Sequence, residues 1–285
     1  ELLGQQVDNG LLGWVLSPLN PNNVGASPDQ LAANAKALDS LRNINTDWQG
    51  VFMRNGNFMS HDLNLAGGTE TSRFYVGAGY YAEDGIGVRS SLKRYTFRAN
   101  FDSRTDKLTF SANSGVGYTK SSFIESENGV ALANPFAAAY LALPYDVLFK
   151  ADGTTAVGPG KTGANAYDRL FNTTQLSNQI KGNLSSTLNY DITRNVSIGG
   201  FAGLDYRQTV TERAVYPGSY AASTAGFPGN TGSYGNGYNN SFEYIVRGNA
   251  GYKNTFADDH DVNLRFVSEY SRSYFKGFNY AGYGI

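Results

Sequence analysis

The stretch Tyr95-Thr96-Phe97-Arg98-Ala99-Asn100-Phe101-Asp102 decides the fold class of this chain. Every odd position in it is apolar and every even position is polar, which is the period of a β-strand with a different environment on each face. A shift of one residue would place Arg98 among the apolar side chains, so the pattern specifies the pairing of this strand strongly. The stretch therefore predicts a strand that separates an apolar medium from a polar one.

The same alternation returns along the chain and predicts eight strands. They lie near residues 57–66, 72–82, 93–102, 108–120, 177–190, 196–210, 242–254 and 260–275. The positions opposite the apolar face carry charges, and we expect these side chains to face a polar lumen: Arg98, Lys181, Asp205, Arg207, Glu243, Arg247, Arg265 and Glu269.

The connections between these strands alternate between short and long. The short ones lie at residues 67–71, 103–107, 191–195 and 256–259, and the long ones at 83–92, 121–176 and 211–241. Outer-membrane β-barrels have this asymmetry, with tight turns on the periplasmic side and long extracellular loops. The predicted fold is all-β, with the antiparallel strands of a transmembrane barrel.

Composition excludes several other classes of protein. The chain has 23 Lys and Arg against 24 Asp and Glu, so it offers no basic face for nucleic acid. It has no cysteine, which removes disulfides and thiolate chemistry. No stretch approaches the roughly 20 consecutive apolar residues of a membrane-spanning helix.

Two short helices are expected in the connecting segments. Ser27-Pro28-Asp29-Gln30 has the pattern of a capping box with proline at the first helical position. Asn134-Pro135 begins a second helix, which Pro144 ends. Trp48, just before the first strand, is expected to anchor a loop or the membrane interface rather than to stack on a sugar.

The long connections are rich in aromatic residues that could contact a ligand or a partner protein. Tyrosine supplies contact area at low entropic cost, although packing of a loop on itself explains each residue singly just as well. The candidate contacts are Tyr140, Tyr145, Phe149 and Tyr167 in the first loop and Tyr216, Tyr220, Tyr234 and Tyr238 in the second.

Nothing in the chain has the pattern of a catalytic or cofactor site. The two histidines, His61 and His260, lack the spacing of a metal motif, and no phosphate-binding loop or nucleophile elbow occurs. Carboxylates on the polar positions are expected to line a solvated pore. We therefore expect no enzymatic activity, no metal and no cofactor.

Several motifs resemble the start of the barrel in SusC-like TonB-dependent transporters. The resemblance is best over residues 43–155. It rests on Asn45-Thr46-Asp47-Trp48-Gln49, Asn64-Leu65, Gly67-Gly68-Thr69, Arg73-Phe74-Tyr75, Gly79-Tyr80, Glu83-Asp84-Gly85-Ile86, Lys93-Arg94-Tyr95-Thr96, Asn134-Pro135-Phe136, Pro144-Tyr145 and Asp152-Gly153. No single one of these motifs would be specific, but their combination is.

The resemblance implies a large barrel in the bacterial outer membrane that imports oligosaccharides or peptides. It also implies a SusD-like surface lipoprotein as a lid, and energy passed on by the TonB complex. The chain is expected to be an internal portion of such a transporter, without plug or TonB box. Residues 1–56 would then form an extracellular segment with a short helix, and residues 57–285 a partial barrel in contact with outer-membrane lipid.

Two other interpretations fit the pattern. Eight strands can close into a free-standing barrel, which would have an adhesive or structural role. A soluble β-sandwich that binds glycans would also contain short alternating strands.

Overall fold

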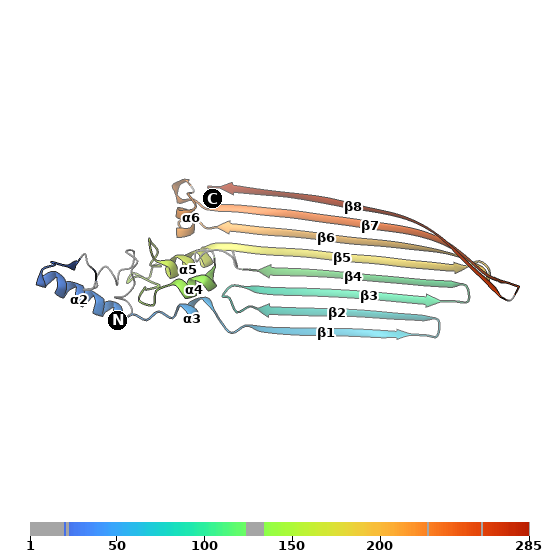
Figure 1. Ribbon diagram of the computed structural model, residues 1–285, viewed down its shortest axis with the longest axis horizontal. Coiled ribbons are helices and arrows are strands. Elements are labelled where there is room, and N and C mark those ends of the chain that lie inside the picture. Colours follow the sequence, from blue (N-terminus) through green and yellow to red (C-terminus); the bar gives the residue numbers. More distant parts are fainter. Residues whose placement is uncertain (1–19, 21–22, 124–133, 227, 258, 285) are drawn as a thin grey trace.

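The described strands form one antiparallel meander, in which each strand pairs with the next along the chain (Figure 1). The computed structural model describes residues 20, 23–123, 134–226, 228–257 and 259–284. The strands are β1 (Asn57–Gly68), β2 (Ser72–Asp84), β3 (Ser91–Arg104), β4 (Leu108–Ser122), β5 (Thr173–Asp191), β6 (Val196–Val215), β7 (Ser233–Phe256) and β8 (His260–Tyr283). The predicted all-β antiparallel fold is confirmed.

The meander is a single open sheet within the described part of the chain. No pairing joins β1 to β8, so these strands do not close into an eight-stranded barrel. Nor do they form the two packed sheets of a sandwich, so the soluble sandwich is wrong as a description of this fold. No described helix is long and apolar enough to span a membrane.

The connections are sorted by length between the two ends of the sheet (Figure 1). The turns after β1, β3, β5 and β7 are short and lie at one end, called here the turn end. The connections after β2, β4 and β6 lie at the other, the loop end, and the two longer ones contain helices. The predicted alternation of short and long connections is confirmed.

The last strands are longer than the alternation predicted. β6 continues to Val215, β7 begins at Ser233, and β8 runs to Tyr283, with Ser233 paired to both Val215 and Tyr283. The placement of Tyr234 and Tyr238 in a loop was therefore wrong, because both lie in β7. The Asn- and Gly-rich sequence there favours turns, but pairing on both sides supplies hydrogen bonds that outweigh this preference.

Helices occupy the loop end. They are α2 (Pro28–Arg42), α3 (Trp48–Phe52), α4 (Pro135–Leu141), α5 (Thr162–Asn172) and α6 (Tyr220–Thr224), with a short 3₁₀ turn, η3 (Pro228–Asn230). Both predicted helices are confirmed: Ser27 and Gln30 form a reciprocal capping box at α2, and Asn134 caps α4. The prediction missed α5, in which Tyr167, Leu170 and Phe171 share one helical face.

The main cluster of buried apolar side chains lies outside the sheet, in a small unit called here the cap, formed by α3, α4, α5 and residues 142–161, which connect α4 to α5. Trp48 and Phe52 of α3 pack against alanines of α4 and α5. The indole Nε1 of Trp48 donates a hydrogen bond to the carbonyl of Leu143 at 2.9 Å. Gly163 permits this packing, since a Cβ there would lie 2.6 Å from the indole ring. Trp48 thus anchors the loop, as predicted.

The continuous register gives the sheet two distinct faces, because side chains alternate along every strand. The apolar face contains Phe97 of β3 and, in register with it, Val116 of β4. The polar face contains Arg98, and the row through it continues with Gly115, Asn183, Asp205 and Glu243.

Candidate functional site

All eight residues predicted to face a lumen lie on the polar face. The register places Lys181 opposite Arg207, and Asp205 opposite both Asn183 and Glu243. Towards the turn end, Arg265 pairs with Gly251 and Arg247 with Glu269. The Arg247 guanidinium donates from Nε to the Glu269 carboxylate at 2.6 Å. The candidate lumen residues therefore share one face of the sheet, where their charges alternate with uncharged side chains.

Glycines keep this surface open at the middle of the sheet. A Cβ at Gly115 would lie 2.7 Å from the Asn183 side-chain oxygen, and one at Gly79 would lie 2.6 Å from the Thr96 hydroxyl. The polar side chains of the neighbouring strands extend over these positions. A substitution there would displace the side chains that define the surface.

The candidate contact residues of the first loop divide into buried and exposed groups. Tyr145 is 5% exposed, and burial in the cap, followed by the nearby Asp146 carboxylate, raises its pKa above the ordinary tyrosine value. Tyr140, in contrast, is 83% exposed on α4. Tyr167 packs edge-on against Phe149, with ring centroids 5.6 Å apart. Only Tyr140 of this group is presented fully to solvent.

The tyrosines of the second loop do not form one cluster either. Tyr216 shares a hydrogen bond with the Thr174 hydroxyl at 2.9 Å, and Tyr220 is the first residue of α6. Tyr238 stacks on Phe278 of β8 on the apolar face, with centroids 5.2 Å apart. Their role as contacts for a ligand or a lid stays a prediction.

A cavity of about 730 Å³ lies at the loop end of β6, β7 and β8, beside α6. Arg213, Thr211, Asn279 and Tyr283 contribute from the strands, Arg169 contributes from α5, and Tyr234 also borders it. Gly235 and Gly237 remove side chains from one wall. Two guanidinium groups line the cavity and no carboxylate does.

Buried polar contacts fix the two arginine-bearing elements around this cavity. The Asp168 carboxylate of α5, 8% exposed, accepts from the Tyr220 N–H of α6 at 2.8 Å and from the Asn172 amide at 2.8 Å. In the orientation that satisfies both groups, the Gln175 side-chain oxygen accepts from two nitrogens of Arg213. The first contact holds α6 against α5, and the second holds the Arg213 side chain against β5.

Sequence reasoning missed both arginines. Arg213 continues the polar series of β6 after Asp205 and Arg207, so extending the period by six residues would have found it. Arg169 belongs to α5, which was not predicted. No sequence pattern connects the two residues, because the pairing of β5 with β6 and the packing of α5 bring them together.

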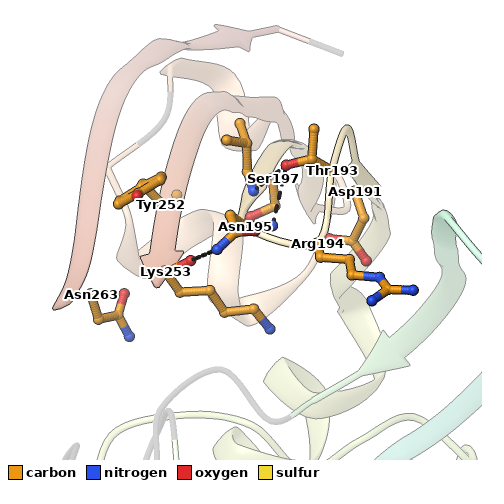
Figure 2. Close-up of a pocket in the computed structure, with 10 residues that line it drawn as sticks. Asp191, Thr193, Arg194, Asn195, Ser197, Tyr252, Lys253 and Asn263 are labelled. Carbon is orange, nitrogen blue, oxygen red and sulfur yellow. Dashed lines mark hydrogen bonds between the residues drawn. The ribbon is translucent and has the colours of Figure 1, made fainter. Parts of the chain in front are cut away.

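A second hollow, of about 110 Å³, lies at the turn end around the connection from β5 to β6 (Figure 2). Asn195 spans this turn: its amide donates to the Lys253 carbonyl at 2.8 Å, and its backbone N–H donates to the Thr193 hydroxyl at 3.2 Å. These bonds satisfy polar groups of the turn and of β7. The hollow is therefore better explained as a consequence of the turn's structure than as a ligand site.

Comparisons with known proteins agree with this architecture. The fold and its two faces define a segment of barrel wall. TonB-dependent receptor P3 of Formosa agariphila is 27% identical over 117 residues, which are 40% of this chain and 12% of the receptor. TonB-dependent receptor P26 of the same organism is 28% identical over 111 residues, which are 39% of this chain and 10% of the receptor. No family model matches.

Solved structures of the RagAB peptide importer share the fold. The 'closed-closed' state aligns with a TM-score of 0.68 at 18% identity, over 85% of this chain and 27% of that one, and the 'open-open' state with 0.67. The chain thus spans about a tenth of the curated relatives and about a quarter of the solved chains. Together, the sequence and fold comparisons confirm the resemblance to the barrel of SusC-like TonB-dependent transporters.

Proposed function

We propose that this chain forms part of the wall of a TonB-dependent transporter in the bacterial outer membrane. The observation that carries the proposal is the separation of charge between the two faces of the sheet. On the apolar face, the described strands carry Asp, Glu, Lys or Arg only at six positions, all in the loop half of their strands: Asp84, Lys93, Lys120, Glu212, Arg272 and Lys276. The polar face carries charges from end to end.

The uncharged part of the apolar face has the dimensions of a membrane. A row of rings, called here the tyrosine row, crosses β1 to β4 with centroids 5.1 to 6.4 Å apart between His61, Tyr80, Tyr95 and Tyr118. From Tyr118 to Phe110 near the turn end, the strand advances about 27 Å at 3.4 Å per residue. The apolar band of an outer-membrane barrel is bounded by aromatic rings and is crossed by tilted strands of about 9–11 residues, and Phe110 to Tyr118 are nine residues.

The loop end would then face the outside of the cell and the polar face the lumen. The cavity between α6 and β6–β8 supports capture of cargo there, and its two guanidinium groups favour an anionic group such as a carboxylate. Peptides and acidic oligosaccharides both carry such groups. A SusD-like lipoprotein as lid and the TonB complex as energy source belong to the same proposal, as does the absence of enzymatic activity.

The chain contains no cysteine, so single cysteines can test the orientation of the faces. Leu184 and Ser185 are adjacent in the middle of β5 and point to opposite faces. In the whole transporter in outer membranes, S185C should react with a water-soluble maleimide. L184C should react only with a lipid-soluble one. Equal labelling of both by the water-soluble reagent would reject the membrane wall.

Cargo capture can be tested at the cavity. Uptake of acidic cargo by whole cells should fall at least about ten-fold in R169Q/R213Q, since even one hydrogen bond to a charged group contributes about 1.5–3 kcal/mol. K36Q/K150Q removes the same charge from α2 and the first loop and serves as the matched control. Unchanged uptake by R169Q/R213Q would remove the cavity from the transport route.

A further inference from the structure

Two lysines lie directly opposite each other on the apolar face. Lys93 of β3 pairs in register with Lys120 of β4, and both side chains are exposed. Each lies two residues beyond a member of the tyrosine row, Tyr95 on β3 and Tyr118 on β4, towards the loop end. The lysine pair therefore lies just outside the uncharged band, on the side of the loop end.

This arrangement is unfavourable for the protein alone. Opposed side chains on neighbouring antiparallel strands have Cβ atoms about 4.5–5.5 Å apart, and like charges there are destabilising. Neither lysine has an ion-pair partner among the described residues. The apolar-face carboxylate on the adjoining strand, Asp84, is paired with Arg54 at 3.4 Å. The repulsion between the lysines calls for an anion from outside the sheet.

The described part of the apolar face carries two further cations, both on β8. Arg272 and Lys276 of β8 lie on the loop side of Tyr270, and the Arg272 guanidinium lies 4.7 Å from the centre of the Tyr274 ring. Among the described strands, cations therefore outnumber carboxylates on this face by four to two, and of the four only Lys93 and Lys120 lie beyond the tyrosine row. An anion at the height of the lysine pair would complement this surplus of positive charge.

We infer that Lys93 and Lys120 bind the phosphate of a lipid headgroup in the leaflet on the loop side. The inference rests on the proposed function, in which this face contacts lipid. The two ammonium groups would donate hydrogen bonds to one phosphate between them, which turns their mutual repulsion into shared attraction. The tyrosines beneath would lie at the junction between headgroup and acyl chains. The partner is thus a phosphorylated membrane lipid, bound to the outer wall.

The experiment uses the whole transporter in maltoside micelles, with diphosphoryl lipid A as the probe. Binding is counted by native mass spectrometry at low salt. K93Q/K120Q should bind lipid A about thirty-fold more weakly than the parent, since each of the two basic residues near an anionic surface contributes about 1 kcal/mol. K36Q/K150Q should bind like the parent. Digalactosyl diacylglycerol, which lacks phosphate, should not distinguish the variants.

The melting temperature gives an independent readout, because the difference between K93Q/K120Q and the parent should change sign when lipid A is added. In phosphate-free micelles K93Q/K120Q should melt higher than the parent, because the repulsion is gone, whereas with lipid A it should melt lower. Equal lipid A binding by parent and K93Q/K120Q would overturn the inference, and so would inorganic phosphate alone binding as tightly as lipid A. If cysteine labelling supports a membrane wall while lipid A shows no preference, only the lysine site is rejected.

Discussion

The cap and the sheet are stabilised in different ways. The cap buries Trp48, Phe52 and several alanines in a small apolar core, as a soluble domain does. In the sheet, by contrast, the edge strands β1 and β8 are exposed at nearly every position. Hydrogen-bonded pairing holds the strands together, while their faces depend on the media that surround them. A mutation in the cap should therefore change stability by altering side-chain packing. A mutation in the sheet should change stability according to whether the new side chain suits lipid or water.

The largest effect is expected at the centre of the cap. Phe52 is fully buried, and F52A should destabilise the cap by about 3–5 kcal/mol, as large-to-small changes in packed cores do. Hydrogen exchange of residues 134–172 in the whole transporter would measure this. F149A, at a ring that is 47% exposed, is the control and should cost less. Equal protection of α4 and α5 in F52A and the parent would show that no cap core exists.

The stability of the sheet should depend on which face carries the substituted residue rather than on how deeply that residue is buried. L184R places a charge in the uncharged band and should cost about 2–4 kcal/mol in a bilayer. S185R, one residue away on the polar face, should have little effect. Denaturant unfolding in lipid vesicles compares the two variants. A larger loss in S185R than in L184R would reverse the assignment of the faces.

The junction between cap and sheet should show an intermediate effect. D168A leaves the Tyr220 N–H without its acceptor and should loosen α6 by about 1–3 kcal/mol. D168N keeps one acceptor oxygen and should lose less. Exchange of residues 219–225 reports on α6 directly. If those amides exchange alike in the parent and D168A, the carboxylate does not hold α6.

The smallest effect concerns the pH response of the cap. Burial raises the pKa of Tyr145 above its ordinary value of 10.0, so its contribution to stability is complete below the unfolded-state pKa and is lost as pH rises through the folded-state pKa. Y145F should change stability by less than about 1 kcal/mol at neutral pH. It should lose less stability than the parent between about pH 9 and 11. Identical alkaline profiles would contradict a raised pKa.

The presence of each strand was predictable because the two faces of the sheet meet different media, which requires apolar and polar residues to alternate along the strand. All eight predicted lumen residues share the polar face, since register preserves the alternation once each strand is found. Strand ends were less predictable: Tyr234 and Tyr238 lie in a sequence with loop composition, yet β6 and β8 pair with it on both sides. Local preference there gives way to hydrogen bonds between distant segments.

The sequence by itself determined the alternation, the sorting of short and long connections, and the capping signals of α2 and α4, because these depend on neighbours within a few residues. Only the tertiary structure decided that Trp48 packs against Gly163 and that Arg169 joins Arg213 around one cavity. It also decided that Lys93 faces Lys120. Such contacts depend on strand register and on helix packing between segments far apart in the chain. The alternation of apolar and polar residues therefore predicts the barrel wall. Strand register and helix packing decide which side chains come together to bind a ligand.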